Sequence, residues 1–379
     1  MNKISDILQI DNLLTDDFAE NISPLSKFLL KRTDVVPTGA DADILHSARE
    51  SLWKKFSGGG NNGLEFCVAA LGRLLSAKFS GKSQGLTAVV MFLEKLATAV
   101  SENRPIIFTF CSGGYKNHNS PEYPEAGWAE FFAIKYLLKY LAPIINNYKH
   151  GVVIEFENEE VSIQFNNVPQ TSTDRYTESF RKLLEYFRGK TDLDLRLVIT
   201  RDMYEAGPQS LYDLMEQKVP EYEKMFSELP AAEQEKWLKR AEHNFMLCGT
   251  HDYSNAARDK IIHEIKRARI MNEAYLDADY CLRSNWFEQD NRITICGTWG
   301  RMPCASPTDT MLHIKSTAHS LTDFWIGTGV LRVKDGTYAE TILSKTQFKE
   351  IIARLEYIKI DSPLGEISEN FKKIPVLNL

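Results

Sequence analysis

Polar side chains follow one strongly apolar segment of the sequence, and they are the first candidates for chemistry. Residues 106–110, Ile-Ile-Phe-Thr-Phe, have the β-branched and aromatic character of a buried strand. Gly113 and Gly114 come next and allow a positive φ or a close approach of the backbone to a ligand. One cation and several hydrogen-bonding groups then follow in Tyr115, Lys116, Asn117 and His118. Such groups at the end of a strand are typical of ligand sites in α/β proteins.

The residue types of this loop leave two interpretations open. It is either part of a ligand site or a hydrophilic surface loop that contains two glycines. It is not a Walker loop or a dinucleotide-binding glycine motif, because the glycine spacing differs and Lys116 is not followed by serine or threonine. An amphipathic helix is predicted directly after the loop, with Glu130 near its start.

Other candidate chemistry is more scattered. Ser112 has no nucleophile elbow around it, and Cys111 fits a buried strand residue as well as an activated thiol. The histidines between residues 243 and 263 form no HExxH motif or close pair, so no metal site is predicted. Basic residues in later segments are the best groups for an anionic substrate, although the helical ones also fit a solvated face. They are Lys266, Arg267, Arg269, Arg283, Arg292, Arg301 and Lys315.

The overall composition is that of an ordinary globular protein. Its 379 residues are 43% hydrophobic and carry a formal net charge of -6, which gives no electrostatic reason to expect nucleic acid. No apolar run reaches the length of a membrane span, and the N-terminus lacks the pattern of a signal peptide. We therefore expect a cytoplasmic protein that does not contact the membrane. The six cysteines show no CxxC spacing, so neither a disulfide framework nor a zinc ribbon is predicted.

The order of predicted elements indicates an α/β fold with a Rossmann-like, mostly parallel sheet. We predict four regions: an N-terminal helical region at 1–103, a Rossmann-like core at 104–205, a helical segment at 206–290, and C-terminal strands and a helix that complete the core at 291–379.

Strand-like and helix-like patterns place the individual elements. Strands are predicted at 106–110, 152–156, 194–200, 292–296, 311–314, 325–333 and 338–342, with 163–165 pairing beside the second of them. Lys334, Asp335 and Gly336 predict a hairpin turn. A helix is predicted at 345–357.

These features together resemble the isocyanide (isonitrile) synthase family of the pyoverdine/dityrosine biosynthesis type. The resemblance is remote and covers roughly residues 104–349. It rests first on the strand, the loop with Lys116 and Asn117, and the Glu130 helix. The later matches are Ile144, Tyr148 and Gly151, the acidic turn 157–160, Tyr176, the Ile-Lys-Arg and Asn-Glu-Ala-Tyr segments at 265–275, the Arg292 strand, and Phe324-Trp325 with the following Asp335-Gly336 turn.

The resemblance implies an enzyme that condenses the amine of an amino acid with ribulose 5-phosphate in secondary-metabolite biosynthesis. One sugar carbon then remains on the nitrogen as the isonitrile, and no cofactor or metal is needed. Lys116 and Glu130 would be catalytic, with Lys116 contacting the sugar phosphate or carbonyl and Glu130 transferring protons or binding the amine. The substrate-binding residues would be Gly113, Gly114, Tyr115, Asn117, His118, Arg267, Arg292 and Arg301. The expected partners are these two substrates, with a homodimer left open as the assembly.

Two departures from the family pattern keep alternatives open. This chain has Cys296-Gly297 where the family has His-Pro, and Ile326 where the family has a histidine after tryptophan. The loss of two acid/base groups fits a different substrate or reaction on the same scaffold. A non-catalytic ligand-binding member and a Rossmann-like transferase that uses another phosphorylated donor are the two alternatives.

Overall fold

The structure is a computed structural model. It describes residues 4–11, 13–14, 28–30, 39, 42–56, 62–74, 86–113, 116, 120–204, 207–248, 256–288, 292–296, 311–313 and 327–379. Five of the predicted site residues lie outside these ranges, namely Gly114, Tyr115, Asn117, His118 and Arg301. In the described part of the chain, every helix is too short or too polar to cross a membrane.

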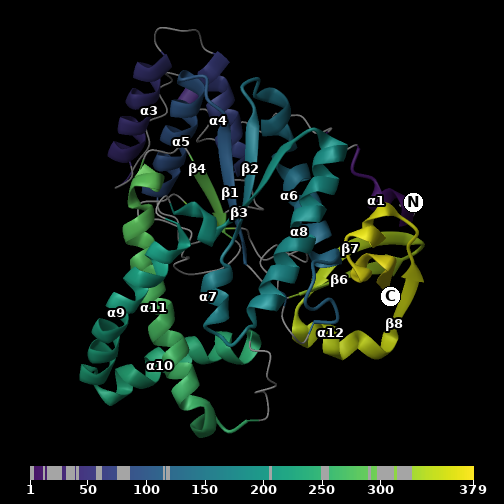
Figure 1. The fold of residues 1–379 in the computed structure, drawn as a ribbon. Coiled ribbons are helices and arrows are strands. Elements are labelled where there is room, and N and C mark those ends of the chain that lie inside the picture. Colours follow the sequence, from purple (N-terminus) through teal and green to yellow (C-terminus); the bar gives the residue numbers. More distant parts are fainter. Residues whose placement is uncertain are drawn as a thin grey trace.

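A parallel sheet forms the centre of the molecule (Figure 1). Its strands are β1 (Ile106–Gly113), β2 (Val152–Asn158), β3 (Asp194–Ile199), β4 (Arg292–Cys296) and β5 (Met311–His313). They lie in the order β3-β2-β1-β4-β5, and all neighbours run parallel. The order reverses between β1 and β4, which is the topological switch point where doubly wound proteins bind ligands. The predicted Rossmann-like parallel sheet is confirmed.

One face of this sheet is aromatic and is covered by two long helices, α6 (Trp128–Asn147) and α8 (Gln170–Thr191). Phe110 of β1 contacts Phe156 of β2 edge to face, and Phe156 contacts Phe180 of α8 in the same way. Alternation along each strand sends these rings to one face and leaves the polar side chains for the other. This packing fixes the position of α8 against β1 and β2.

Helices α3 (Ala42–Phe56), α4 (Asn62–Leu74) and α5 (Leu86–Ser101) lie together at one end and side of the sheet (Figure 1). The short helix α1 (Ile4–Leu8) lies apart from them, beside the C-terminal strand Thr337–Leu343. Helix α5 packs against β1 and β4, and the Lys95 ammonium donates a hydrogen bond of 2.7 Å to the Arg292 carbonyl oxygen. The predicted N-terminal helical region is therefore confirmed.

The helical segment projects as an arm of three helices, α9 (Pro208–Glu228), α10 (Ala231–Cys248) and α11 (Arg258–Glu288) (Figure 1). The arm has its own apolar cluster, which includes Phe226, Phe245 and Ile265. A short helix, α7 (Glu160–Gln164), follows β2 where a strand was predicted at 163–165. That prediction is wrong, because Val161 packs into the apolar cluster between α7, α9 and α11 instead of extending the sheet.

The C-terminal residues build a second, mixed sheet beside α6. Its strands are β6 (Thr328–Lys334), β7 (Thr337–Leu343), β8 (Leu355–Lys359) and β9 (Lys373–Asn378), in the order β7-β6-β9-β8. The predicted hairpin turn is present, with positive φ at Asp335 and Gly336. The predicted helix at 345–357 is too long, since α12 (Lys345–Ile351) ends early and β8 pairs with β9.

Candidate functional site

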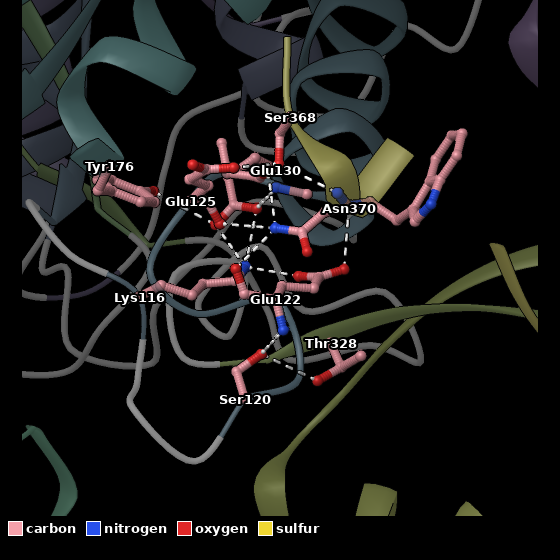
Figure 2. A network of polar contacts seen from close by, with 12 residues as sticks. Lys116, Ser120, Glu122, Glu125, Glu130, Tyr176, Thr328, Ser368 and Asn370 are labelled. Carbon is pink, nitrogen blue, oxygen red and sulfur yellow. Dashed lines mark hydrogen bonds and ion pairs between the residues drawn. The ribbon is translucent and has the colours of Figure 1, made fainter. Parts of the chain in front are cut away.

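Lys116 lies just after β1 and is surrounded by two carboxylates (Figure 2). Its ammonium is 2.6 and 2.8 Å from the two carboxylate oxygens of Glu130 and 2.8 Å from Oε2 of Glu122. The Lys116 and Glu130 side chains are 0% exposed, and that of Glu122 is 6% exposed. We refer to Lys116, Glu122 and Glu130 as the Lys116 triad. The two residues that the sequence predicted as catalytic are thus in direct contact.

The beginning of helix α6 holds both carboxylates in place. The first N–H groups of a helix have no partner within the helix, and carboxylates are favourable acceptors for them. The Gly127 N–H donates to Oε2 of Glu130 at 2.8 Å, and the Trp128 N–H donates to Oε1 of Glu122 at 3.0 Å. A Cβ at Gly127 would lie 2.6 Å from the carboxyl carbon of Glu122, so only glycine leaves room for this approach.

Charge in the triad is unbalanced, because two carboxylates share one ammonium. Burial raises the pKa of Glu130 to about 7; Lys116 opposes this shift and the second carboxylate, Glu122, adds to it. Burial alone would lower the pKa of Lys116, but Glu122 and Glu130 outweigh it and the pKa is raised. Glu130 therefore exchanges a proton near neutral pH while Lys116 stays charged, which is the behaviour expected of an acid/base group.

Tyr176 of α8 completes the polar environment of Glu130. Its hydroxyl donates to Oε1 of Glu130 at 3.3 Å, and the side chain is completely buried. Burial and the nearby Glu130 raise the pKa of this phenol well above 10, so it remains a neutral donor. The sequence identified Tyr176 only through the family resemblance.

The short helical turn before β9 fixes the loop that carries Glu122. The Asn370 side-chain amide donates to the Glu122 carbonyl oxygen at 2.6 Å, and the Ser368 hydroxyl donates to Oε2 of Glu125 at 2.8 Å (Figure 2). The Trp128 indole N–H donates to the Lys373 carbonyl oxygen at 2.8 Å. Sequence reasoning missed Glu122 and Asn370, because nothing local marks a contact that joins residues 248 positions apart.

A cavity of about 660 Å³ lies between this loop and the C-terminal sheet, and Glu122 is the member of the triad that lines it. Its other walls include Trp128, Tyr357 and three lysines. Glu122 thus connects the buried proton-holding pair with a space large enough for a small molecule.

Arg292, a predicted substrate-binding residue, is held by another acid. From β4 it makes two hydrogen bonds to Glu155 of β2, at 2.7 and 3.3 Å, and Thr109 of β1 donates to the same carboxylate at 3.4 Å. These residues project from one polar face of the sheet. Arg267 lies on α11 and is exposed, and Gly113 ends β1. The structure brings Lys116 and Glu130 together, whereas Arg292 is bound to Glu155 and Arg267 lies on α11.

A second buried acid lies at the end of β2. Glu160 is bound by the backbone N–H and guanidinium of Arg201, at 3.1 and 3.0 Å, and burial raises its pKa to about 7. No group of three or more metal-binding side chains is arranged to hold an ion within the ranges that the structure describes. Because Glu160 is a buried acid whose pKa is raised to a similar value, it can serve as a control for Glu130.

Comparison with known proteins gives a structural relationship. No family model and no curated protein matches the sequence. Among solved structures, the chain is similar to the PvcA protein from Pseudomonas aeruginosa, with a TM-score of 0.59 and 13% sequence identity. The match covers 82% of this chain and 99% of PvcA. The chain therefore has the same overall fold as PvcA.

Proposed function

We propose that this chain is an isonitrile synthase-like enzyme that condenses the amine of an amino acid with ribulose 5-phosphate. The observation that carries the proposal is the Lys116 triad at the end of the first strand. It combines a titratable carboxyl, Glu130, with a second carboxyl, Glu122, that lines a cavity. The isonitrile synthase-like fold shared with PvcA supports it, in agreement with the sequence resemblance. The substrates are part of the proposal.

The first step of such a reaction needs the chemistry that the triad offers. When an amine adds to a ketone, the resulting hydroxyl leaves as water only after it receives a proton. Glu130 holds a proton near pH 7, and Glu122 is the triad member that reaches the cavity. We propose that the proton moves from Glu130 through Lys116 to Glu122 and then to the substrate. Lys116 thus links the two acids instead of binding the phosphate.

The other predicted residues retain proposed roles around the substrate. Gly113 ends β1, three residues before Lys116, and we propose that the loop after it, with Gly114, Tyr115, Asn117 and His118, contacts the substrate. Arg301 is proposed to bind its carboxylate or phosphate. Arg292 is proposed to act indirectly by holding Glu155, and Arg267 remains a proposed contact on α11.

The test is turnover by purified protein supplied with amino acids and ribulose 5-phosphate, with mass spectrometry to detect a carbon-inserted product. Glu130→Gln is expected to lower turnover by at least about a hundredfold, the usual contribution of an acid/base group. Glu160→Gln is the matched control, since it removes another buried acid with a similar pKa. Unchanged turnover in folded Glu130→Gln protein contradicts the assigned role, and no product from any amino acid contradicts the reaction.

A second candidate function is ligand binding without catalysis. The complete burial of Lys116 and Glu130 favours it, because the same contacts also serve to anchor the start of α6. An increase in melting temperature with amino acids or sugar phosphates, without any product, would support binding over catalysis.

A further inference from the structure

Three lysines gather around the cavity beside Glu122, although the chain as a whole is acidic. Lys359 ends β8, Lys372 precedes β9 and Lys373 begins it. All three side chains belong to exposed residues. Lys372 is paired with Glu369. The charges of the other two, Lys359 and Lys373, are not compensated by this ion pair.

Lys359 and Lys373 are directly opposite each other in the antiparallel β8/β9 pair. Residues at opposite positions project to the same face with their Cβ atoms about 5 Å apart, and like charges there are destabilising. The Lys373 ammonium lies 4.9 Å from the centre of the Tyr357 ring. Lys359 forms no ion pair with any residue of the described chain. An anion between the two ammonium groups would remove their repulsion.

The rest of the cavity suits the body of a small molecule. Tyr357 and Trp128 supply aromatic surface. The carboxylate of Glu122 is engaged by the Lys116 ammonium and the Trp128 N–H, so its charge is partly neutralised from the inside. The presence of Glu122 in the cavity wall is therefore compatible with an anionic ligand.

We propose that this cavity binds a small phosphate monoester, with the phosphate between Lys359 and Lys373 and the remainder against Tyr357 and Trp128. A phosphate dianion matches the charge of two lysines, which bind phosphate as point charges. The anion site stands on the lysine geometry; identifying its ligand as the sugar phosphate substrate rests on the proposed function.

Calorimetric titration of the full chain in low-salt, phosphate-free buffer tests the site. The probes are ribulose 5-phosphate and phenyl phosphate, each compared with its unphosphorylated counterpart, ribulose or phenol. Lys359→Met and Lys373→Met are each expected to weaken phosphate-dependent binding at least tenfold. Lys334→Met is the matched control, because this exposed lysine of the same sheet lies opposite Thr337 and outside the cavity.

Melting temperature gives an independent measurement. Without anion, Lys359→Met should melt higher than the unchanged chain at low salt, because the repulsion with Lys373 is gone, and added salt should reduce this difference. Lys334→Met should show no such gain.

The outcomes answer two questions separately: whether the cavity binds phosphate, and which ligand carries that phosphate. Tighter binding of ribulose 5-phosphate assigns the phosphate to the substrate, and tighter binding of phenyl phosphate assigns it to a ligand with an aromatic body. Equal binding of phosphorylated and unphosphorylated probes, or binding that ignores both lysine variants, overturns the site. Lysine-dependent binding without any carbon-inserted product leaves the site intact and contradicts only the proposed reaction.

Discussion

Two buried charge clusters lie close to the switch point of the sheet, and they differ in how many cations compensate each buried carboxylate. In the sheet, the carboxylate of Glu155 faces two guanidinium groups: Arg292 makes two hydrogen bonds to it, and the half-exposed Arg196 lies 3.9 Å away. At the start of α6, one ammonium meets two carboxylates, Glu122 and Glu130. The carboxylate in the sheet therefore has cations to compensate its charge, whereas in the triad two carboxylates share one ammonium and the pKa of Glu130 is raised to about 7. The imbalance is what makes the triad suitable for proton transfer.

Removal of the shared cation should have the largest effect. In Lys116→Met, two buried carboxylates lose their ammonium, and we expect the free energy of unfolding to fall by about 3–5 kcal/mol. Urea denaturation at pH 8 measures the loss. Lys372→Met is the control for losing a lysine from an exposed pair, with an expected change within about 0.5 kcal/mol. A loss below 1 kcal/mol for Lys116→Met would show that the triad is not a buried charge cluster in solution.

The pH dependence of stability should report Glu130. Its pKa is raised from 4.5 to about 7 by folding, so the folded state holds the proton more tightly than the unfolded chain. The resulting stabilisation is complete below pH 4.5 and is lost as the pH rises through 7, with a total of about 3 kcal/mol. Urea denaturation between pH 4.5 and 8 should therefore show a smaller decrease in stability for Glu130→Gln than for the unchanged chain.

Glu160→Gln is the control for this pH series. Burial raises the pKa of Glu160 to about 7 as well, so this variant should lose only its own part of the pH dependence and keep the part due to Glu130. The double variant should be the least sensitive to pH in this range. Parallel stability curves for the unchanged chain and Glu130→Gln would contradict the raised pKa of Glu130.

The contact between Arg292 and Glu155 should depend on the shape of the guanidinium more than on its charge. Arg292→Lys keeps the positive charge but loses the planar fork, so one of the two bonds to Glu155 disappears and we expect a loss of about 2 kcal/mol. Urea denaturation gives the value. Arg196→Lys is the control, because Arg196 lies 3.9 Å from the same Glu155 but is half exposed. Equal effects of the two substitutions would mean that burial does not distinguish the contacts.

Local sequence signals predicted the parts of the site that lie next to each other in the chain. The apolar run of β1, the glycines after it and the amphipathic pattern of α6 placed Lys116 and Glu130 at a strand-to-helix connection. The mostly parallel sheet followed from the alternation of strands and helices, whereas the order of its strands was not predicted. Glu122 could not be chosen in this way, because its role comes from the bond to Lys116 and from a loop held by Asn370.

The helix predicted at 345–357 was too long for the same reason, since a contact with a distant segment decides the structure there. Phe348, Ile351, Leu355 and Ile358 recur at helical spacing, which favours one long helix over 345–357. Pairing of β8 with β9 overrides this pattern after α12. That pairing also creates the opposed Lys359 and Lys373, a feature that no local pattern indicates.

The smallest expected effect concerns the backbone beneath the triad. In Gly127→Ala, the new Cβ would lie 2.6 Å from the carboxyl carbon of Glu122 and push it away from Lys116 and the Trp128 N–H, at a cost of about 1–2 kcal/mol. Gly189→Ala in α8 is the matched control, since a Cβ there meets no atom within 4 Å and should stabilise the helix by about 0.5–1 kcal/mol. Opposite signs for the two substitutions in urea denaturation support the close approach of Glu122. The same sign for both would mean that Glu122 does not occupy this place, and the link between the cavity and Glu130 would then be lost.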